Sequence, residues 1–205
     1  MDEGVLLKLV SFGDELVKGN AAPKYLANKL GYEFCDLAQD DICNQQIFRA
    51  VLNYIIDNKD DFILIGWTHS KRIEMDWKSR QFTYRPDRND YIDNGINGLH
   101  RYDDLLFDDL LQGQHWASEV YTLQQTLQFH KIKYYMYNTQ DKIYFHQKTM
   151  RNLKALNARQ YHNPINLQSS MLHFLNKEGF KELNDLAHKR WSEFLYDKIV
   201  AGEVL

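Results

Sequence analysis

The feature that most constrains the fold is a short apolar run near the N-terminus, Val5 to Phe12, which ends in Gly13-Asp14-Glu15. The run has the length of a strand rather than of a buried helix. A buried strand that breaks at a glycine, with carboxylates just past its end, is how open α/β sheets present chemical groups at their carboxyl edge. We therefore expect any functional site of this chain to begin at Asp14 and Glu15.

Helices and strands alternate after this first strand. Pro23 lies in the first turn of the next predicted helix and Gly31 follows its end, which is the usual asymmetry of helix termini. The third apolar run has no polar position, as in a strand covered on both faces, and it ends at Gly66. This alternation predicts a parallel sheet. The predicted elements are a helix over 21–30, a strand over 32–38, a helix with the stripe Ile47, Val51 and Ile55 capped by Asp40 or Asp41, and a strand over 62–65.

The second half of the chain predicts further helices around one more strand. Its last helix carries a periodic apolar face that includes Trp191 and Leu195. With 205 residues and 44% hydrophobic content the chain can bury one substantial core, so we expect a single domain over 1–205. The predicted elements are helices over 102–111 and 115–130 separated by 112–114, a strand over 131–138, a short helix within 169–176 and a helix over 183–200.

Residues 67–100 differ from the rest in being polar, aromatic and basic with no sustained period. A long excursion at the carboxyl end of a strand often forms the wall of a binding site. A solvated loop or a small hairpin is the alternative. We predict an aromatic and basic insertion at about 67–100 and leave both interpretations open. Its basic residues are Lys71, Arg72, Lys78, Arg80, Arg85 and Arg88.

Composition excludes several classes of protein. A formal net charge of -3 gives no reason to expect nucleic acid as a partner. No stretch approaches the ~20 apolar residues of a membrane span, and the acidic start of the chain does not fit a secretory signal. The two cysteines, Cys35 and Cys43, fit reduced thiols. These observations predict a soluble cytoplasmic protein with no membrane partner.

Three blocks of the sequence resemble the SGNH (GDSL-type) hydrolases. Gly13-Asp14-Glu15 is similar to their opening Gly-Asp-Ser block. The stretch 65–68, Ile-Gly-Trp-Thr, with Arg72 and Glu74 after it, resembles the third block of a phage-type branch, and 37–44 resembles the second. The resemblance spans nearly the whole chain. It implies a three-layer, flavodoxin-like α/β fold with helices on both faces of a parallel sheet. It also implies a phage setting, either the cytoplasm of the host cell or the virion.

The resemblance also implies that the usual chemistry is lost. In the family the third residue of the first block is the serine nucleophile, and here it is Glu15. A carboxylate cannot form the acyl-enzyme ester of a serine esterase. Asp41, or a neighbour in its turn, stands where the oxyanion-hole glycine would be, and a negative side chain there opposes a developing oxyanion. Asn44 matches the asparagine of that block, although it also suits a helix start.

The fourth block fits in two registers. Asp185 and His188 match Asp-x-x-His, which would supply a base and its orienting acid. Alternatively, residues 187–191 match a later segment of the phage branch, which places Glu182 where the catalytic histidine belongs and Gly179 near its aspartate. The second register is preferred because it also accounts for Trp191, Glu193 and Leu195. It leaves Asp185 as a charge in the first turn of a helix.

Two function hypotheses from different classes follow. The first is a catalytically degenerate protein that acts as a binding or structural component, with a protein neighbour in an assembly or a glycan as partner. The second is an active esterase or de-acylase on acylated carbohydrate with a rearranged site. We also weigh Ser11 as a nucleophile, glycoside hydrolysis by Glu15 with Glu182 or Asp185, and binding of an acidic polymer by the arginines at 72, 80, 85 and 88. We expect no metal and no cofactor. The candidate catalytic residues are Asp14, Glu15, Asp185 and His188, vestigial or rearranged, and the candidate binding residues are Asn44, Trp67, Thr68 and Arg72.

Overall fold

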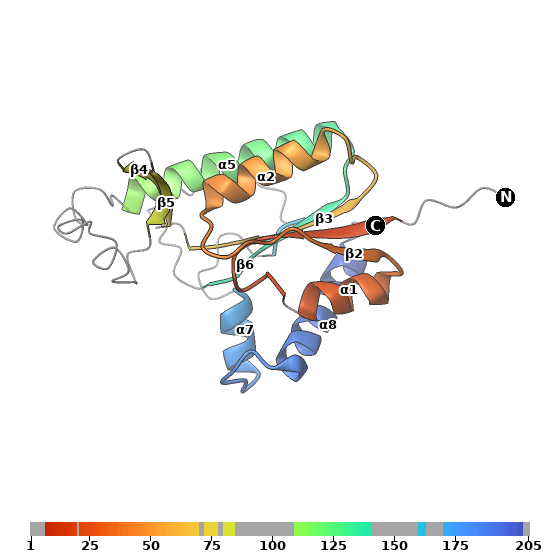
Figure 1. Ribbon diagram of the computed structural model, residues 1–205. Coiled ribbons are helices and arrows are strands. Elements are labelled where there is room, and N and C mark those ends of the chain that lie inside the picture. The colour runs from red at the N-terminus through yellow and green to blue at the C-terminus, as the bar shows by residue number, and fades with distance from the viewer. Residues whose placement is uncertain are drawn as a thin grey trace.

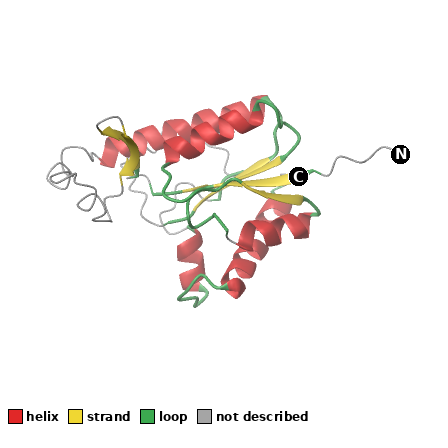
Figure 2. Ribbon diagram, in the orientation of Figure 1, coloured by secondary structure: helices red, strands yellow, loops and turns green. Residues whose placement is uncertain are grey.

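A parallel sheet lies between two layers of helices in the computed structural model (Figures 1 and 2). The structure describes residues 7–19, 21–69, 72–77, 80–84, 109–140, 160–162 and 170–202. Helices α2 and α5 cover one face, and α1, α7 and α8 lie on the other (Figure 1). The helices are α1 (Ala21–Leu30), α2 (Asn44–Ile55), α5 (Asp109–Phe129), α7 (Met171–Lys177) and α8 (Asp185–Ala201). The strands are β1 (Lys8–Phe12), β2 (Glu33–Asp36), β3 (Phe62–Trp67), β4 (Ile73–Trp77), β5 (Arg80–Tyr84) and β6 (Tyr134–Asn138).

The order of strands in the sheet is β2-β1-β3-β6, and every neighbouring pair is parallel. A short segment at 160–162 continues this pattern on the far side of β6, where Tyr161 forms a parallel bridge with Met136. The chain reverses its direction of travel across the sheet between β1 and β3, so the carboxyl ends of these two strands meet at the switch point where α/β sheets bind ligands. The α/β fold class expected from the sequence is confirmed.

Alternate side chains of the strands supply two separate cores. Val10 and Ile63 face α2 and α5, whereas Leu9 and Leu64 face α1 and α8. All six residues of β3 are buried. The continuous apolar run in the sequence reflects this burial, because a strand covered on both faces has no polar position.

The boundaries of the helices differ from the prediction in two places. Residues 112–114, expected to separate two helices, lie inside α5. Glutamine is a good helix former and one glycine costs only about 1 kcal/mol relative to alanine, so Gly113 does not end the helix. The cap of α2 is Cys43 rather than Asp40 or Asp41. The backbone N–H of Cys43 donates to Gln46 Oε1 at 2.9 Å in a capping box.

The described part of the predicted insertion is an antiparallel hairpin. Its two strands, β4 and β5, pair from Ile73 opposite Tyr84 to Trp77 opposite Arg80. Residues 70, 71, 78, 79 and 85–100 of this segment, including Arg85 and Arg88, lie outside the described residues. None of the helices in the described ranges is long and apolar enough to cross a membrane.

Candidate functional site

The turn after β1 holds two consecutive carboxylates at the carboxyl edge of the sheet. The strand ends at Phe12, and Gly13 leads into a turn in which the backbone carbonyl of Asp14 accepts hydrogen bonds from the N–H groups of Val17 and Lys18. Asp14 Oδ1 also accepts from the N–H of Leu16 at 3.0 Å. The expectation that Asp14 binds backbone donors of this turn agrees with that contact.

Glycines allow β1 and β3 to approach each other closely at this edge. A Cβ on Gly13 would clash with the side chain of Val17 and lie 2.9 Å from the carbonyl oxygen of Gly66. A Cβ on Gly66 would in turn lie 2.5 Å from Val17 Cγ2 and 3.1 Å from Thr139 Cγ2. The two glycines therefore bring the end of β1 against the end of β3, where Thr68 and Arg72 follow.

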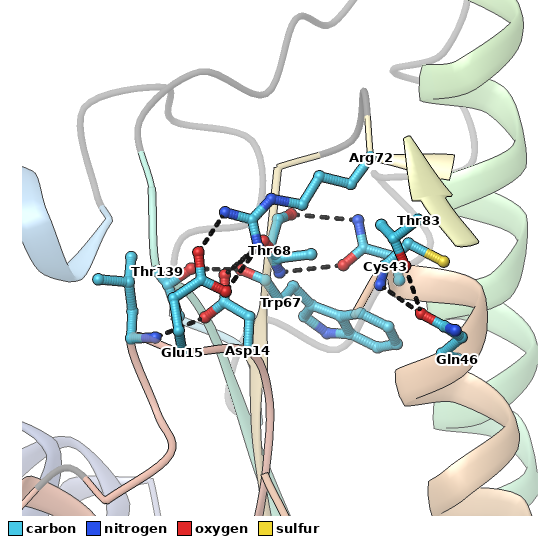
Figure 3. A network of polar contacts seen from close by, with 11 residues as sticks. Asp14, Glu15, Cys43, Gln46, Trp67, Thr68, Arg72, Thr83 and Thr139 are labelled. Atoms are coloured by element: carbon cyan, nitrogen blue, oxygen red, sulfur yellow. Dashed lines mark hydrogen bonds and ion pairs between the residues drawn. The ribbon is translucent and has the colours of Figure 1, made fainter. Parts of the chain in front are cut away.

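Arg72 binds both carboxylates of the turn (Figure 3). Its Nη1 donates to Asp14 Oδ2 at 3.1 Å and to Glu15 Oε2 at 2.9 Å, and its Nη2 donates to Glu15 Oε1 at 2.6 Å. The contact with Glu15 uses two guanidinium nitrogens and both carboxylate oxygens, which is the strongest geometry for this pair. On a continued strand the two carboxylates would point to opposite faces. They reach one guanidinium because β1 ends before them.

Asp14 and Arg72 form the buried part of this network. The side chains of Asp14 and Arg72 are 0% and 3% exposed, whereas that of Glu15 is 27% exposed. The hydroxyl of Thr68 donates to Asp14 Oδ2 at 2.5 Å. Burial raises the pKa of Asp14 above its usual value, and the charge of Glu15 adds to this effect. The hydrogen bond from Thr68 and the charge of Arg72 act in the opposite direction.

Asn44 joins the start of α2 to the end of β3. Its side-chain N–H donates to the carbonyl of Thr68 at 3.1 Å, and its Oδ1 accepts from the N–H of Thr68 at 2.9 Å. The two bonds fix the backbone of Thr68 and thus the direction of its hydroxyl toward Asp14. Asn44 is a helix-start residue whose amide is also bound into the site.

The hairpin is anchored to the N-terminal half of α2. Glu74 accepts hydrogen bonds from Arg49 Nη2 at 2.8 and 2.6 Å and from Gln46 Nε2 at 3.3 Å. Thr83 of β5 donates its hydroxyl to Gln46 Oε1 at 3.1 Å. Arg72 and Glu74, noted together in the sequence, therefore bind in different directions, and the anchor at Glu74 sets where Arg72 enters the site. Sequence reasoning did not find Gln46 and Arg49, because the helical period marks neither residue.

The other candidates lie elsewhere or have structural partners. Asp185 begins α8 and accepts the hydroxyl of Tyr25 of α1 at 2.7 Å. His188 follows one turn later, and burial lowers its pKa while the charge of Asp185 opposes the change.

Ser11, weighed as a nucleophile, is buried in β1 and donates its hydroxyl to Asp36 at 2.9 Å. The indole of Trp67 is fully buried, and its N–H has no hydrogen-bond partner in the part of the chain that the structure describes.

The turn before α2 has the backbone shape of a glycine turn. Asp41 has a φ of 57°, in the left-handed region that asparagine, aspartate and especially glycine tolerate. The sequence resemblance puts Asp41, or a neighbour in its turn, at the position of the oxyanion-hole glycine, and this alignment stays a prediction. Among the residues that the structure describes, no group of three or more His, Cys, Asp or Glu side chains could hold a metal ion.

The sequence matches no protein family model and no curated protein. Two solved structures have a similar chain path. One is a protein of Slackia heliotrinireducens proposed to be an SGNH hydrolase, with a TM-score of 0.39 and 12% identity over 71% of this chain and 63% of that protein. The other is TesA, with a TM-score of 0.46 and 9% identity over 97% of this chain and 99% of TesA. The α/β assignment made above rests on the strand order and parallel register, independently of these likenesses.

The chemistry open to this site follows from its charges. Arg72 engages both oxygens of Glu15, so this carboxylate is an ion-pair partner rather than a poised base or nucleophile. The same arrangement, two acids and one arginine among hydroxyl and amide groups, is suited to holding a turn in place or to recognising a charged group.

Proposed function

We propose that this protein is a catalytically degenerate SGNH hydrolase-like protein that acts as a binding or structural component, in the setting of a phage virion. The observation that carries the proposal is the two-point ion pair of Glu15 with Arg72. In the sequence resemblance, Glu15 occupies the position of the serine nucleophile. The phage setting is inferred from the phage-type blocks at 37–44 and 65–68.

Serine-esterase chemistry needs a nucleophile within hydrogen-bond reach of a base that a third group orients. Glu15 is engaged by Arg72, and Asp185 is engaged by Tyr25 in the layer formed by α1 and α8. Support for lost catalysis thus comes from both ends of the expected triad. The partner is a protein neighbour in an assembly or a glycan, because the aromatic and basic composition of residues 67–100 suits either of these surfaces.

The test is hydrolysis of p-nitrophenyl acetate by the purified protein, Glu15→Ala and Glu15→Ser. We expect the rate of all three to equal that of the buffer and of heat-unfolded protein. Activity of the original protein that disappears in both variants would overturn the proposal, because Glu15 would then be a working catalytic group. Activity gained by Glu15→Ser alone would support a lost nucleophile and would favour the register in which His188 is the base and Asp185 is the acid that orients it.

A further inference from the structure

The two carboxylates that share Arg72 differ in their exposure to solvent. Asp14 is fully buried and accepts from three separate donors, the Thr68 hydroxyl, the Leu16 N–H and the Arg72 guanidinium. Glu15 lies between the guanidinium and solvent, with 27% of its side chain exposed. Asp14 is thus a buried part of the site, and Glu15 is the carboxylate on the solvent side of Arg72.

Without the Glu15 side chain, Arg72 and the residues that hold it form a built receptor for a carboxylate. Asp14 holds the guanidinium of Arg72 through a hydrogen bond to Nη1. The hairpin that follows Arg72 is held on α2 by the contact of Glu74 with Arg49. The two Nη groups of Arg72 meet both oxygens of Glu15 at 2.9 and 2.6 Å. A guanidinium fixed in this way presents the parallel N–H fork that matches a planar carboxylate.

We propose that Arg72 is a carboxylate receptor that Glu15 closes from within, and that an acidic side chain of a neighbouring protein takes the place of Glu15 when the protein assembles. This inference rests on the proposed binding role of the same site. The exchange replaces one carboxylate by another on the same guanidinium, so it leaves no charge buried without a partner.

The burial of Arg72 favours a side chain over a sugar. With Glu15 in place, only 3% of the Arg72 side chain is exposed, and the group that reaches it is a carboxylate on a thin aliphatic arm. The acidic side chains of proteins have that shape. A uronic acid carries its carboxylate directly on a pyranose ring, which needs a wider opening.

The test uses acetate as a filler for the atoms that Glu15→Ala removes. Glu15→Ala retains Cβ and loses a CH2 and the carboxylate, which is the size of acetate. The thermal midpoint of unfolding, Tm, is measured for the original protein and for Glu15→Ala in sodium acetate and in sodium chloride of equal ionic strength. Glucuronate is the second probe. Asp40→Ala is the matched control, because it removes a carboxylate whose ion pair with Lys18 is exposed.

We expect acetate to raise the Tm of Glu15→Ala by about 3–6 °C relative to chloride at ten times its dissociation constant. The Tm of the original protein and of Asp40→Ala should not respond, and Arg72→Met added to Glu15→Ala should abolish the response. An equal Tm of Glu15→Ala in acetate and chloride would overturn the receptor. Glucuronate that raises the Tm as much as acetate does would overturn the choice of a side chain and favour a glycan. Both readouts are of binding, so they are independent of the hydrolysis assay that tests the proposed function.

Discussion

The guanidinium of Arg72 meets the carboxylate of Glu15 through two hydrogen bonds of 2.9 and 2.6 Å, although 57 residues separate them in the sequence. The same Nη1 also reaches Asp14, so one arginine neutralises parts of two adjacent acids. This contact connects the end of β1 to the segment that leaves β3. The contribution of this contact and of the residues around it to stability can be tested one residue at a time.

Thr68→Val should destabilise the protein by about 1–3 kcal/mol. The substitution keeps the shape of the side chain and removes the hydroxyl that donates to Asp14 Oδ2 at 2.5 Å in a buried position. Urea unfolding gives the free energy directly. Thr126→Val is the matched control, since its exposed hydroxyl donates to the carbonyl of Thr122 at 2.9 Å. Equal losses in the two variants would contradict a special role for the buried hydroxyl.

Asn44→Ala should also cost about 1–3 kcal/mol, because it leaves the N–H and the carbonyl of Thr68 without the partners they have in a buried site. Asn58→Ala, which removes one partly buried bond to the carbonyl of Tyr54, should cost less. Urea unfolding of both variants measures the difference. If Asn44→Ala were the milder change, the bridge between α2 and β3 would not matter for stability.

Glu119 of α5 should make stability fall as pH rises. Burial raises its pKa from 4.5 to about 7, and the charge of Arg49 only partly opposes this. The folded protein therefore holds a proton that the unfolded chain has lost between these two values, and the resulting penalty is fully present above pH 7. Glu119→Gln should match the original protein near pH 4.5 and exceed its stability by roughly 1–3 kcal/mol at pH 8. The exposed Glu182→Gln variant is the control, and a constant difference for Glu119→Gln would refute the assignment.

His162 should act in the opposite direction. It packs against Phe194 and Trp191, with ring centroids 4.8 and 6.2 Å away, and burial, followed by the charge of Lys198, lowers its pKa from 6.5 to about 4. The unfolded chain takes up a proton between these values and the folded protein does not, so stability falls as pH drops from 6.5 toward 4. His162→Phe keeps the ring and should flatten this loss in unfolding measured at several pH values. Exposed His115→Phe is the control, and equal pH profiles of His162→Phe and the original protein would count against this account.

The sequence predicted the sheet well because each strand and helix leaves a local signal. The all-apolar run at 62–65 marks a strand covered on both faces, and the spacing of Pro23 and Gly31 marks α1. The break expected at 112–114 was wrong, because one glycine between strong helix formers is a small penalty that packing against α2 outweighs.

The candidate site was predicted in part. The sequence named Glu15 and Arg72 but not their contact, because no periodicity reports on two residues so far apart in the chain. Arg49 and Gln46 were not named, since they lie in α2 and act only once the hairpin folds back onto it. Whether the named residues form a catalytic or a binding site stays a prediction.

The most direct test of the central claim is a double-mutant cycle of Glu15→Gln and Arg72→Met, measured as free energies of unfolding in urea. If the turn has become an ion-paired structure, each single variant is less stable than the original protein, and the coupling energy between the two is about 2 kcal/mol or more. A working catalytic acid would give the opposite result. Glu15→Gln would then be more stable than the original protein, as relief of active-site strain predicts, and the coupling would lie within about 0.5 kcal/mol of zero.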